Sequence, residues 1–368
     1  MSIATISNVS QSFGAFDVFS GLSAGIPNDG KIGLVGPNGI GKTTLLRIIA
    51  GLSEPTSGGV YIARGTRLGY LRQEAAQAFS GRQHTVHDEM LTVFAELRTQ
   101  EVQLREMEEA MAGIATTDSL FEQYGAAQES FELAGGYEYE LRIQQVLDGL
   151  GFSHEQSQMP LAHLSGGQMT RALLARLLLE KTDLLIQDEP TNHLDVQAVE
   201  WLETTLRLWE GALLIVSHDR YFLDSVVNRI WEMTRVNLEV YRGNYSAYVR
   251  QRQERWERQQ QLYEAEKERL AKELDFIRRH IAGQNTDIAK GKLKRLSREL
   301  LALEQLGIAG IQGKSWSEMD VGRVRPMTVA EAAERIKQFR PPLTRPPQLN
   351  IRLNVSQRGG DTVLRSND

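Results

Sequence analysis

The chain contains no cysteine, which excludes disulfides and thiolate metal sites and is compatible with a reducing compartment. It also has no apolar run near the ~20 residues that a membrane-spanning helix needs. Its longest apolar stretches, such as 184–186 and 212–216, have only the length of strands. The opening residues Met1–Ala4 have neither the basic nor the apolar segment of a secretion signal. The sequence therefore predicts a cytoplasmic protein with no membrane domain.

Charge and apolar content are ordinary. The 368 residues carry a formal net charge of −5, and 41% of them are hydrophobic and 24% charged. This balance does not indicate disorder. It predicts a globular chain that can hold two modest domains.

Four short strings occur in a fixed order along the chain, and their combination is more informative than any one of them. They are Gly36-Pro37-Asn38-Gly39-Ile40-Gly41-Lys42-Thr43, Leu164-Ser165-Gly166-Gly167-Gln168, Asp188-Glu189-Pro190-Thr191-Asn192-His193-Leu194-Asp195 and Ser217-His218-Asp219. The first alone is a phosphate-binding loop with a real risk of a false match. The others are typical of a nucleotide-sensing loop, a metal-and-base pair of carboxylates and a switch histidine. Together they predict an ATP-binding cassette.

The glycine-rich string lies where a phosphate-binding loop must lie, between a strand predicted at 31–35 and a helix predicted from Lys42 to Gly51. Glycines let backbone N–H groups approach a phosphate closely, and the helix adds the positive end of its dipole. Lys42 is expected to bridge the β- and γ-phosphates of ATP. The predicted ATP-binding residues here are Gly36, Pro37, Asn38, Gly39, Ile40, Gly41, Lys42, Thr43 and Thr44.

Two adjacent carboxylates follow the apolar strand predicted at 184–187. Asp188 and the hydroxyl of Thr43 are predicted to hold Mg²⁺ from opposite sides. Glu189 is then placed to orient or deprotonate the attacking water. The polar Gln187 stands where an apolar residue is expected, and we interpret it as a tolerated residue at the strand end.

Three further side chains are candidates for the same site. His218 follows a strand predicted at 212–216 and is expected to contact the γ-phosphate, although a lone histidine there is more often a structural hydrogen bonder. Gln73 is a candidate for both the metal and the attacking water. Phe13 is a candidate for stacking on adenine, while core packing of Phe13 and a competing role for Phe16 stay open.

The string 164–168 is expected to act across an interface. In a cassette, the Ser165 hydroxyl and the amides of Gly166 and Gly167 lie at a helix N-terminus far from their own phosphate loop. Ser165, Gly166, Gly167 and Gln168 are therefore predicted to contact ATP held by a second cassette, supplied in cis or by a homodimer. Asp195 is expected at the same interface. The string also caps a helix predicted at 169–179, and the two roles are compatible.

The start of the chain and a later polar region predict two further features. Residues Ile3–Val9 predict a short edge strand, and the turn after it holds Phe13, Phe16 and Phe19. A helical arm rich in Glu and Gln is inserted at about 91–132. Its two predicted helices are Val93–Met111 and Ser119–Leu133.

These features predict an α/β fold, a P-loop NTPase ATP-binding cassette with an inserted α-helical arm, followed by an antiparallel α-helical hairpin linker. The predicted domains are the cassette at 1–243, the hairpin at 244–306, and a proline-containing linker with one short helix, 329–339, at 307–368.

The hairpin is predicted from spacing. The residues of a heptad-like seam are Tyr263, Leu270, Leu274, Ile277 and Ile281 on the outgoing helix and Leu293, Leu296, Leu300 and Leu303 on the return. Basic side chains gather near the turn, at Arg278, Arg279, Lys290, Lys292, Lys294 and Arg295. This clustering favours contact with nucleic-acid phosphates, and Gln284 and Asn285 could add hydrogen bonds to a sugar or base. The alternative is that these basic residues only form a solvated face of the hairpin.

The chain resembles the ABC-F proteins. The resemblance rests on the unbroken string 188–195 and on Gly243-Asn244-Tyr245-Ser246 before a long charged helix, and it covers about Ile3 to Leu306. It implies a cytoplasmic ATPase with two cassettes on one chain, ATP and Mg²⁺ as ligands, and a hairpin that reaches into the ribosome beside the peptidyl-tRNA. Ribosomal RNA and tRNA are the implied partners.

One departure from the family is large, because only one complete cassette is recognised in this sequence. The segment 354–357 repeats Asn8-Val9-Ser10-Gln11, so Leu349–Val355 is predicted to open a second cassette, and a truncated chain is the interpretation. Two other functions are alternatives: the nucleotide-binding subunit of a membrane transporter, and a DNA-repair type of ATPase. A transporter's nucleotide-binding subunit lacks the long hairpin, and in a DNA-repair type of ATPase a coiled coil divides the cassette motifs, whereas here they all precede it.

Overall fold

The computed structural model describes residues 2–71, 79, 81–112, 118–283, 286–311 and 325–339. The chain divides into two compact units, residues 1–249 and 250–368. A long helix, α10 (Tyr245–His280), begins in the first unit and continues in the second. Gln73, Gln284, Asn285 and the strand predicted at 349–355 lie outside the described residues.

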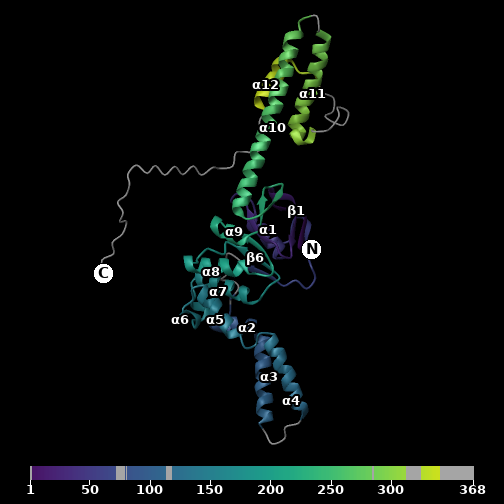
Figure 1. The fold of residues 1–368 in the computed structure, drawn as a ribbon. Helices are drawn as coiled ribbons and strands as arrows, with labels where there is room; N and C mark the ends of the chain where they lie inside the picture. Colours follow the sequence, from purple (N-terminus) through teal and green to yellow (C-terminus); the bar gives the residue numbers. More distant parts are fainter. Residues whose placement is uncertain are drawn as a thin grey trace, which may run out of the picture. The chain divides into compact units, whose positions relative to one another are not determined.

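Six described strands of the first unit form a mainly parallel sheet (Figure 1). They are β3 (Lys31–Val35), β5 (Leu68–Leu71), β6 (Leu184–Asp188), β7 (Ala212–Val216), β8 (Arg229–Met233) and β9 (Leu238–Arg242). Their order is β5-β6-β7-β3-β8-β9, and only the β8–β9 pair is antiparallel. The central strands β6 and β7 are buried over their whole length, as expected where both faces of a parallel sheet are covered.

A second, antiparallel sheet corrects two expectations. Its strands are β1 (Ser2–Phe13), β2 (Phe16–Pro27) and β4 (Ser57–Ile62). The prediction of a short edge strand was wrong, because β1 has 12 residues and lies between the other two. The expected aromatic turn is only Gly14 and Ala15, so Phe16 and Phe19 belong to β2. The polar residues after Val9 resemble a loop, but Ser10 pairs with β4, and Gln11 and Ser12 pair with β2, which keeps the segment extended.

Helices cover both faces of the main sheet. On one face, α1 (Lys42–Ile49) packs in a core shared by the two sheets. The helices whose residues form the core on the other face are α2 (Val86–Val93), α5 (Tyr139–Gly149), α7 (Gly166–Leu179), α8 (Val196–Arg207) and α9 (Arg220–Val226). A short helix, α6 (His154–Ser157), contacts α2. Along β6, side chains alternate between these two cores, with Leu184 and Ile186 on the α1 side and Leu185 opposite.

The inserted arm is a pair of helices, α3 (Ala95–Met111) and α4 (Asp118–Leu133), which lie side by side (Figure 1). Their bounds agree with the predicted helices to within two residues. The Tyr124 hydroxyl donates to Glu108 across the pair at 2.7 Å. The Tyr139 hydroxyl of α5 donates to Glu101 at 2.8 Å and so ties α3 to the cassette. The arm is therefore part of the first unit.

The second unit is a helical hairpin completed by a third helix. The helix α10 packs against α11 (Thr286–Ile311) through the predicted leucine and isoleucine seam, of which Leu270, Ile277 and Leu296 are fully buried. The short helix α12 (Val329–Gln338) joins the same core with Ala332 and Ile336, which the sequence did not predict.

The third helix changes the role of two polar side chains in this unit. The buried Ser297 hydroxyl donates to Leu293 O at 2.7 Å and accepts from Met327 N at 3.0 Å, which ties the segment before α12 to α11. Tyr263, predicted in the seam, stacks on Phe339 after α12, with ring centroids 4.9 Å apart. The fold class predicted from the sequence is confirmed. Within the described residues, no helix is both long enough and apolar enough to cross a membrane.

A buried carboxylate anchors the start of α2. The Glu89 side chain is fully buried and makes ion pairs with Arg82 and Arg176, while His84 Nε2 contacts its second oxygen. Arg176 also pairs with Glu180 at 2.8 Å. Burying a charge is costly unless it is paired and hydrogen-bonded, so this cluster stabilises the junction of α2 and α7 only while every partner is present.

Replacing the carboxylate should therefore destabilise the first unit. We expect Glu89→Gln to lower its free energy of unfolding by about 3 kcal/mol, since the substitution removes the carboxylate charge that Arg82 and Arg176 share and leaves Arg176 paired with Glu180 alone. Urea unfolding followed by circular dichroism measures the change. Glu106→Gln, an exposed position on α3, is the matched control. An unfolding midpoint for Glu89→Gln equal to that of the control would contradict the argument.

Candidate active site

A cavity of about 470 Å³ opens at the carboxyl ends of β3, β6 and β7. In open α/β sheets, ligands bind at this edge of the sheet. The residues that line the cavity are Phe13, Phe16, Val18, Asn38, Gly39, Gly41, Lys42, Thr43, Thr44, Asp188, Glu189, Val216 and His218. Most of the side chains predicted for nucleotide, metal and water thus border one space.

The glycines of the loop are required by close contacts. Gly41 has φ +99°, and a Cβ built on it would lie 2.5 Å from a methyl group of Val18. At Gly36 a Cβ would meet the carbonyl oxygen of Met233 at 2.8 Å. Only glycine fits both positions, which lets the loop turn tightly before α1 begins at Lys42. Val18 was not among the predicted site residues, because a valine at a strand position carries no signal of a ligand.

Lys42 folds back over the loop that precedes it. Its ammonium group donates to the carbonyl oxygens of Gly36 at 2.9 Å and Pro37 at 3.1 Å. Burial lowers the pKa of Lys42, while the carboxylates of Glu189 and Asp188 act in the opposite direction. The charge is thus held beside the two acidic residues at the end of β6. Gly36, Pro37 and Ile40 shape the loop but are not among the cavity-lining residues.

Asp188, the last residue of β6, is 4% exposed. Burial raises the pKa of its carboxyl group, and the Thr43 hydroxyl, Lys42 and His218 each oppose that rise. Its Oδ2 atom is buried and has no hydrogen-bond partner among the residues that the structure describes. A hydroxyl and an unpartnered carboxylate oxygen are hard oxygen ligands, so the pair fits Mg²⁺.

The described part of the chain holds no cluster of three or more His, Cys, Asp or Glu residues that could bind a metal alone. Mg²⁺ is usually held by one or two protein ligands together with substrate phosphates and water.

Glu189 leaves the strand in a left-handed conformation, with φ +54°. Its backbone N–H donates to Val216 O at 2.8 Å, and its Oε2 accepts from the backbone N–H of His218 at 3.1 Å. The His218 ring lies 3.5 Å from Oε1 and is mostly exposed, whereas the Glu189 side chain is 11% exposed. Burial is the main cause that raises the pKa of Glu189. The carboxylate is thus fixed in direction and made a stronger base.

Two phenylalanines border the cavity at its outer edge. Phe13 of β1 and Phe16 of β2 are cross-strand partners, 62% and 55% exposed respectively. The Arg235 guanidinium lies over the Phe16 ring, 5.5 Å from its centroid. Both rings are therefore candidates for an aromatic contact, and Phe13 is not a core residue.

The residues of the string 165–168 are not among those that line this cavity. Ser165 is the N-cap of α7: its Oγ accepts from Gln168 N at 3.3 Å, and Gln168 Oε1 accepts from Ser165 N at 2.9 Å. Gly167 gives room for His193, whose Cβ would lie 3.1 Å from an added Cβ. Asp195 caps α8 by accepting from Ala198 N at 2.8 Å. The helix-capping role expected for this string is thus observed at Ser165, and Asp195 caps a helix as well.

Gln187 is not the strand-end residue that we expected. It lies inside β6, fully buried, and neither end of its amide has a hydrogen-bond partner among the described residues. The alternation along β6 places it on the face opposite Asp188. The error arose because a polar residue before an aspartate suggests that the strand has already reached solvent.

Comparison with known proteins identifies the chain's relatives. Residues 19–192 match a family model described as ABC transporter, and a second model with the same description matches residues 231–305. The chain is 41% identical over 317 residues to the ATP-binding protein YdiF of Bacillus subtilis, a match covering 83% of this chain and 48% of YdiF.

Two further relatives extend the comparison. The chain is 36% identical over 302 residues to the energy-dependent translational throttle protein EttA of Mycobacterium tuberculosis, covering 82% of this chain and 52% of EttA. It is 30% identical over 362 residues to the uncharacterized ABC transporter ATP-binding protein YfmM of Bacillus subtilis, covering 97% of this chain and 68% of YfmM. The chain spans about half the length of YdiF and EttA.

The cassette motifs thus border one cavity in an α/β fold, and the relatives share the sequence from the cassette into the helical extension. The chain therefore belongs to the ATP-binding cassette family, and its relatives confirm the ABC-F resemblance found in its motifs.

Proposed function

We propose that the chain binds Mg·ATP in the cavity at the end of β6, hydrolyses it, and couples this turnover to engagement and release of the ribosome. The observation that carries the first part is the cavity itself. It brings Lys42, Thr43, Asp188, Glu189 and His218, which come from three distant parts of the sequence, to one edge of the sheet.

The loop and Lys42 are the proposed phosphate site. Positive φ at Gly39 and Gly41 turns the loop before α1, and such loops present backbone N–H groups to an anion at the positive end of a helix. The Lys42 ammonium, now on the carbonyls of Gly36 and Pro37, is within the same cavity and would exchange those contacts for phosphate oxygens. Phe13 or Phe16 would stack on the adenine ring.

Thr43 and Asp188 are the proposed Mg²⁺ ligands, on the strength of the unpartnered Oδ2 of Asp188. Bound there, the ion neutralises charge that develops on the transferred phosphoryl group. Asp188 Oδ2 is buried and has no hydrogen-bond partner among the described residues, so binding Mg²⁺ would give this oxygen an interaction that compensates for its burial.

Glu189 is the proposed base. The backbone N–H of His218 holds one of its oxygens, and burial raises the pKa of the group, so the other oxygen is both directed and more basic than on the surface. His218, exposed at the rim, would contact the γ-phosphate. Gln73, for which we proposed a role with metal and water, remains a prediction.

A second cassette would complete the site. Ser165, Gly166 and Gly167 form the N-terminus of α7 but do not line the cavity of their own chain. We infer that they contact ATP held by another cassette, in cis or in a two-fold homodimer, in which each copy would present the same surface to the other.

Binding to the ribosome is the least direct step. It is supported by the helical hairpin, by the exposed basic residues near its turn, including Lys290, Lys294 and Arg295, and by the similarity to a protein named a translational throttle. Ribosomal RNA and tRNA offer the phosphates that such residues bind. A protein acting there would be cytoplasmic.

Loss of the proposed base should stop turnover but not binding. We expect Glu189→Gln to reduce the ATPase rate ~100-fold or more, as for loss of a positioned base, while ATP affinity is retained. Lys42→Ala should instead weaken ATP binding. Phosphate release and nucleotide titration separate the two, with the exposed Glu109→Gln on α3 as the control. An unchanged steady-state rate for Glu189→Gln would remove this assignment.

If a second cassette completes the site, the ATPase rate per molecule should depend on protein concentration. Because Ser165 must come from another cassette, we expect the chain to bind Mg·ATP as a monomer but to hydrolyse it faster per molecule as concentration rises. Sedimentation of Glu189→Gln in ATP should show the dimer directly. An ATPase rate per molecule that stays high and constant at dilutions where the protein is monomeric would contradict the need for a second cassette.

Neutralising the hairpin turn should weaken RNA binding without affecting hydrolysis. In the triple variant Lys290→Gln, Lys294→Gln and Arg295→Gln, we expect the slope of log affinity against log salt to fall by roughly 0.7 to 0.9 for each RNA phosphate that the variant no longer neutralises. Ribosome co-sedimentation over a salt series measures it. Lys272→Gln is the control, because Lys272 pairs with Glu268 at 2.8 Å. A slope equal to that of the unmodified chain would favour a merely solvated face.

A further inference from the structure

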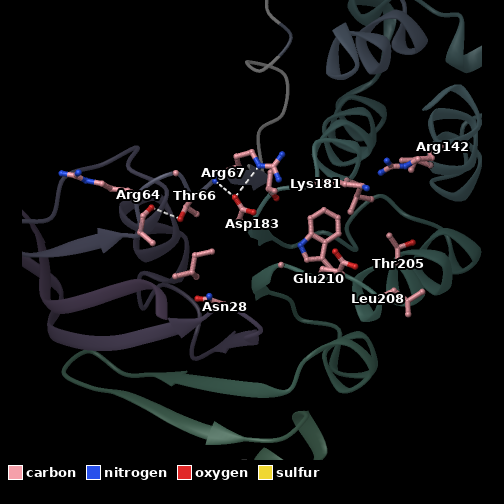
Figure 2. A pocket seen from close by; sticks show the side chains of 18 residues that line it. Asn28, Arg64, Thr66, Arg67, Arg142, Lys181, Asp183, Thr205, Leu208 and Glu210 are labelled. Carbon is pink, nitrogen blue, oxygen red and sulfur yellow. Dashed lines mark hydrogen bonds and ion pairs between the residues drawn. The ribbon is translucent and has the colours of Figure 1, made fainter. Parts of the chain in front are cut away.

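A second and larger cavity, of about 770 Å³, lies at the opposite edge of the same sheet (Figure 2). Arg67, Asp183 and Gly211, which line it, immediately precede β5, β6 and β7. It therefore borders the amino ends of the strands whose carboxyl ends carry the nucleotide cavity. The two cavities share no lining residue.

Two buried polar groups in this lining have no hydrogen-bond partner among the residues that the structure describes. Thr182 is 6% exposed, and its hydroxyl makes no hydrogen bond to any described residue. The indole N–H of Trp209 is likewise buried and unpartnered within the described part of the chain. Leaving such a buried group without a hydrogen bond costs about 1–3 kcal/mol. A ligand that forms the missing hydrogen bonds would explain why the cavity has two such groups.

The backbone around these groups includes a glycine that no larger residue can replace and a lysine with a positive φ. A Cβ on Gly211 would lie 2.8 Å from the carbonyl oxygen of Thr182 and 2.9 Å from the Trp209 indole nitrogen, so any larger residue would displace the indole. Lys181 has φ +46°, a conformation that non-glycine residues adopt rarely. Such strain tends to gather at ligand sites.

The charges on the lining favour an anion. Lys181 and Arg142 approach from the turn before β6 and from α5, and in Figure 2 their cationic ends point toward one another. Asp183 is already engaged, because Arg67 donates its backbone N–H to the carboxylate at 2.7 Å and adds an ion pair at 3.6 Å. The Arg64 side chain extends away from the others, and Glu210 is the second acidic group on the lining.

Part of the lining is apolar. Val146, Leu178, Leu208 and the Trp209 ring border the same space as the cations and the two unpartnered donors. Cavities of about 300–1,000 Å³ that combine apolar walls with a few convergent polar groups are the size and kind that bind small molecules.

We propose that this cavity binds a small organic anion, a phosphorylated or carboxylated compound with an aromatic or other apolar body. Lys181 and Arg142 bind the anionic group, Thr182 and Trp209 donate hydrogen bonds, and the apolar wall contacts the body. The site is separate from the phosphate-binding loop, so it does not rest on the ATPase proposal.

Titration calorimetry with three probes tests the chemistry. The probes are 1-naphthyl phosphate, which has both ring and charge, 1-naphthol, which has the ring alone, and inorganic phosphate, which has the charge alone. We expect saturable binding of one molecule of the ester, and binding at least 10-fold weaker for each of the other two. Equal or tighter binding of either simpler probe would overturn the proposed ligand class.

Variants locate the binding. We expect Lys181→Gln combined with Arg142→Gln to weaken the ester at least 10-fold, and Thr182→Val, which keeps the shape but removes the hydroxyl, to weaken it several-fold. Arg64→Gln should have no effect. Lys42→Ala should also leave binding unchanged, and loss of binding in that variant would place the ester in the nucleotide cavity instead.

Folding is checked by circular dichroism and the urea midpoint of each variant. Should Thr182→Val fail to fold, the double variant still decides the matter, since the Lys181 side chain is exposed and Arg142 is only half-buried. Undiminished affinity in a folded double variant, or no saturable binding of the ester at all, would overturn the proposal.

Discussion

Two neighbouring carboxylates buried at the end of one strand are the constraint around which the cassette is organised. Asp188 and Glu189 are adjacent in sequence, and burial raises the pKa of both. Side chains of adjacent strand residues point to opposite faces, so a regular strand could not direct both groups into one cavity. The left-handed conformation at Glu189 ends the strand at the point where this problem arises. The backbone N–H groups of Glu189 and His218 then fix the second carboxylate in place.

The same constraint explains the neighbouring elements. A buried pair of like charges needs cations and donors close by, and Lys42 supplies the opposing charge while the Thr43 hydroxyl stabilises the ionised Asp188. Lys42 can lie there only because the glycine loop turns tightly, and the contact between Gly41 and Val18 makes that turn depend on the antiparallel sheet. The second sheet is thus a structural support for the loop as well as a cover for α1.

Local patterns in the sequence predicted many of the elements and candidate site residues, but they did not predict the features that depend on contacts between residues far apart in the sequence. The glycine loop, the carboxylate pair, the arm helices and the hairpin seam are each encoded within a few turns of chain. Part of the loop and both carboxylates border one cavity, and the leucines of the seam share one core. The central position of β1, the packing of α12 on the hairpin and the burial of Gln187 depend on residues far away in sequence. Periodicity cannot show such partners. Val18 and the φ of Glu189 carry no local signal at all.

The capping geometry of Ser165 is compatible with its proposed contact to ATP held by a second cassette. Its Oγ accepts the N–H of Gln168, which uses one acceptor position of the hydroxyl. A serine hydroxyl also has a hydrogen to donate, so capping α7 leaves the donor for a phosphate oxygen. The orphan N–H groups of the first helical turn, among them those of Gly166 and Gly167, would add to it. Because Gln168 holds the cap from its other side, the proposed donor set is rigid before a second cassette arrives, and little ordering would remain to oppose binding.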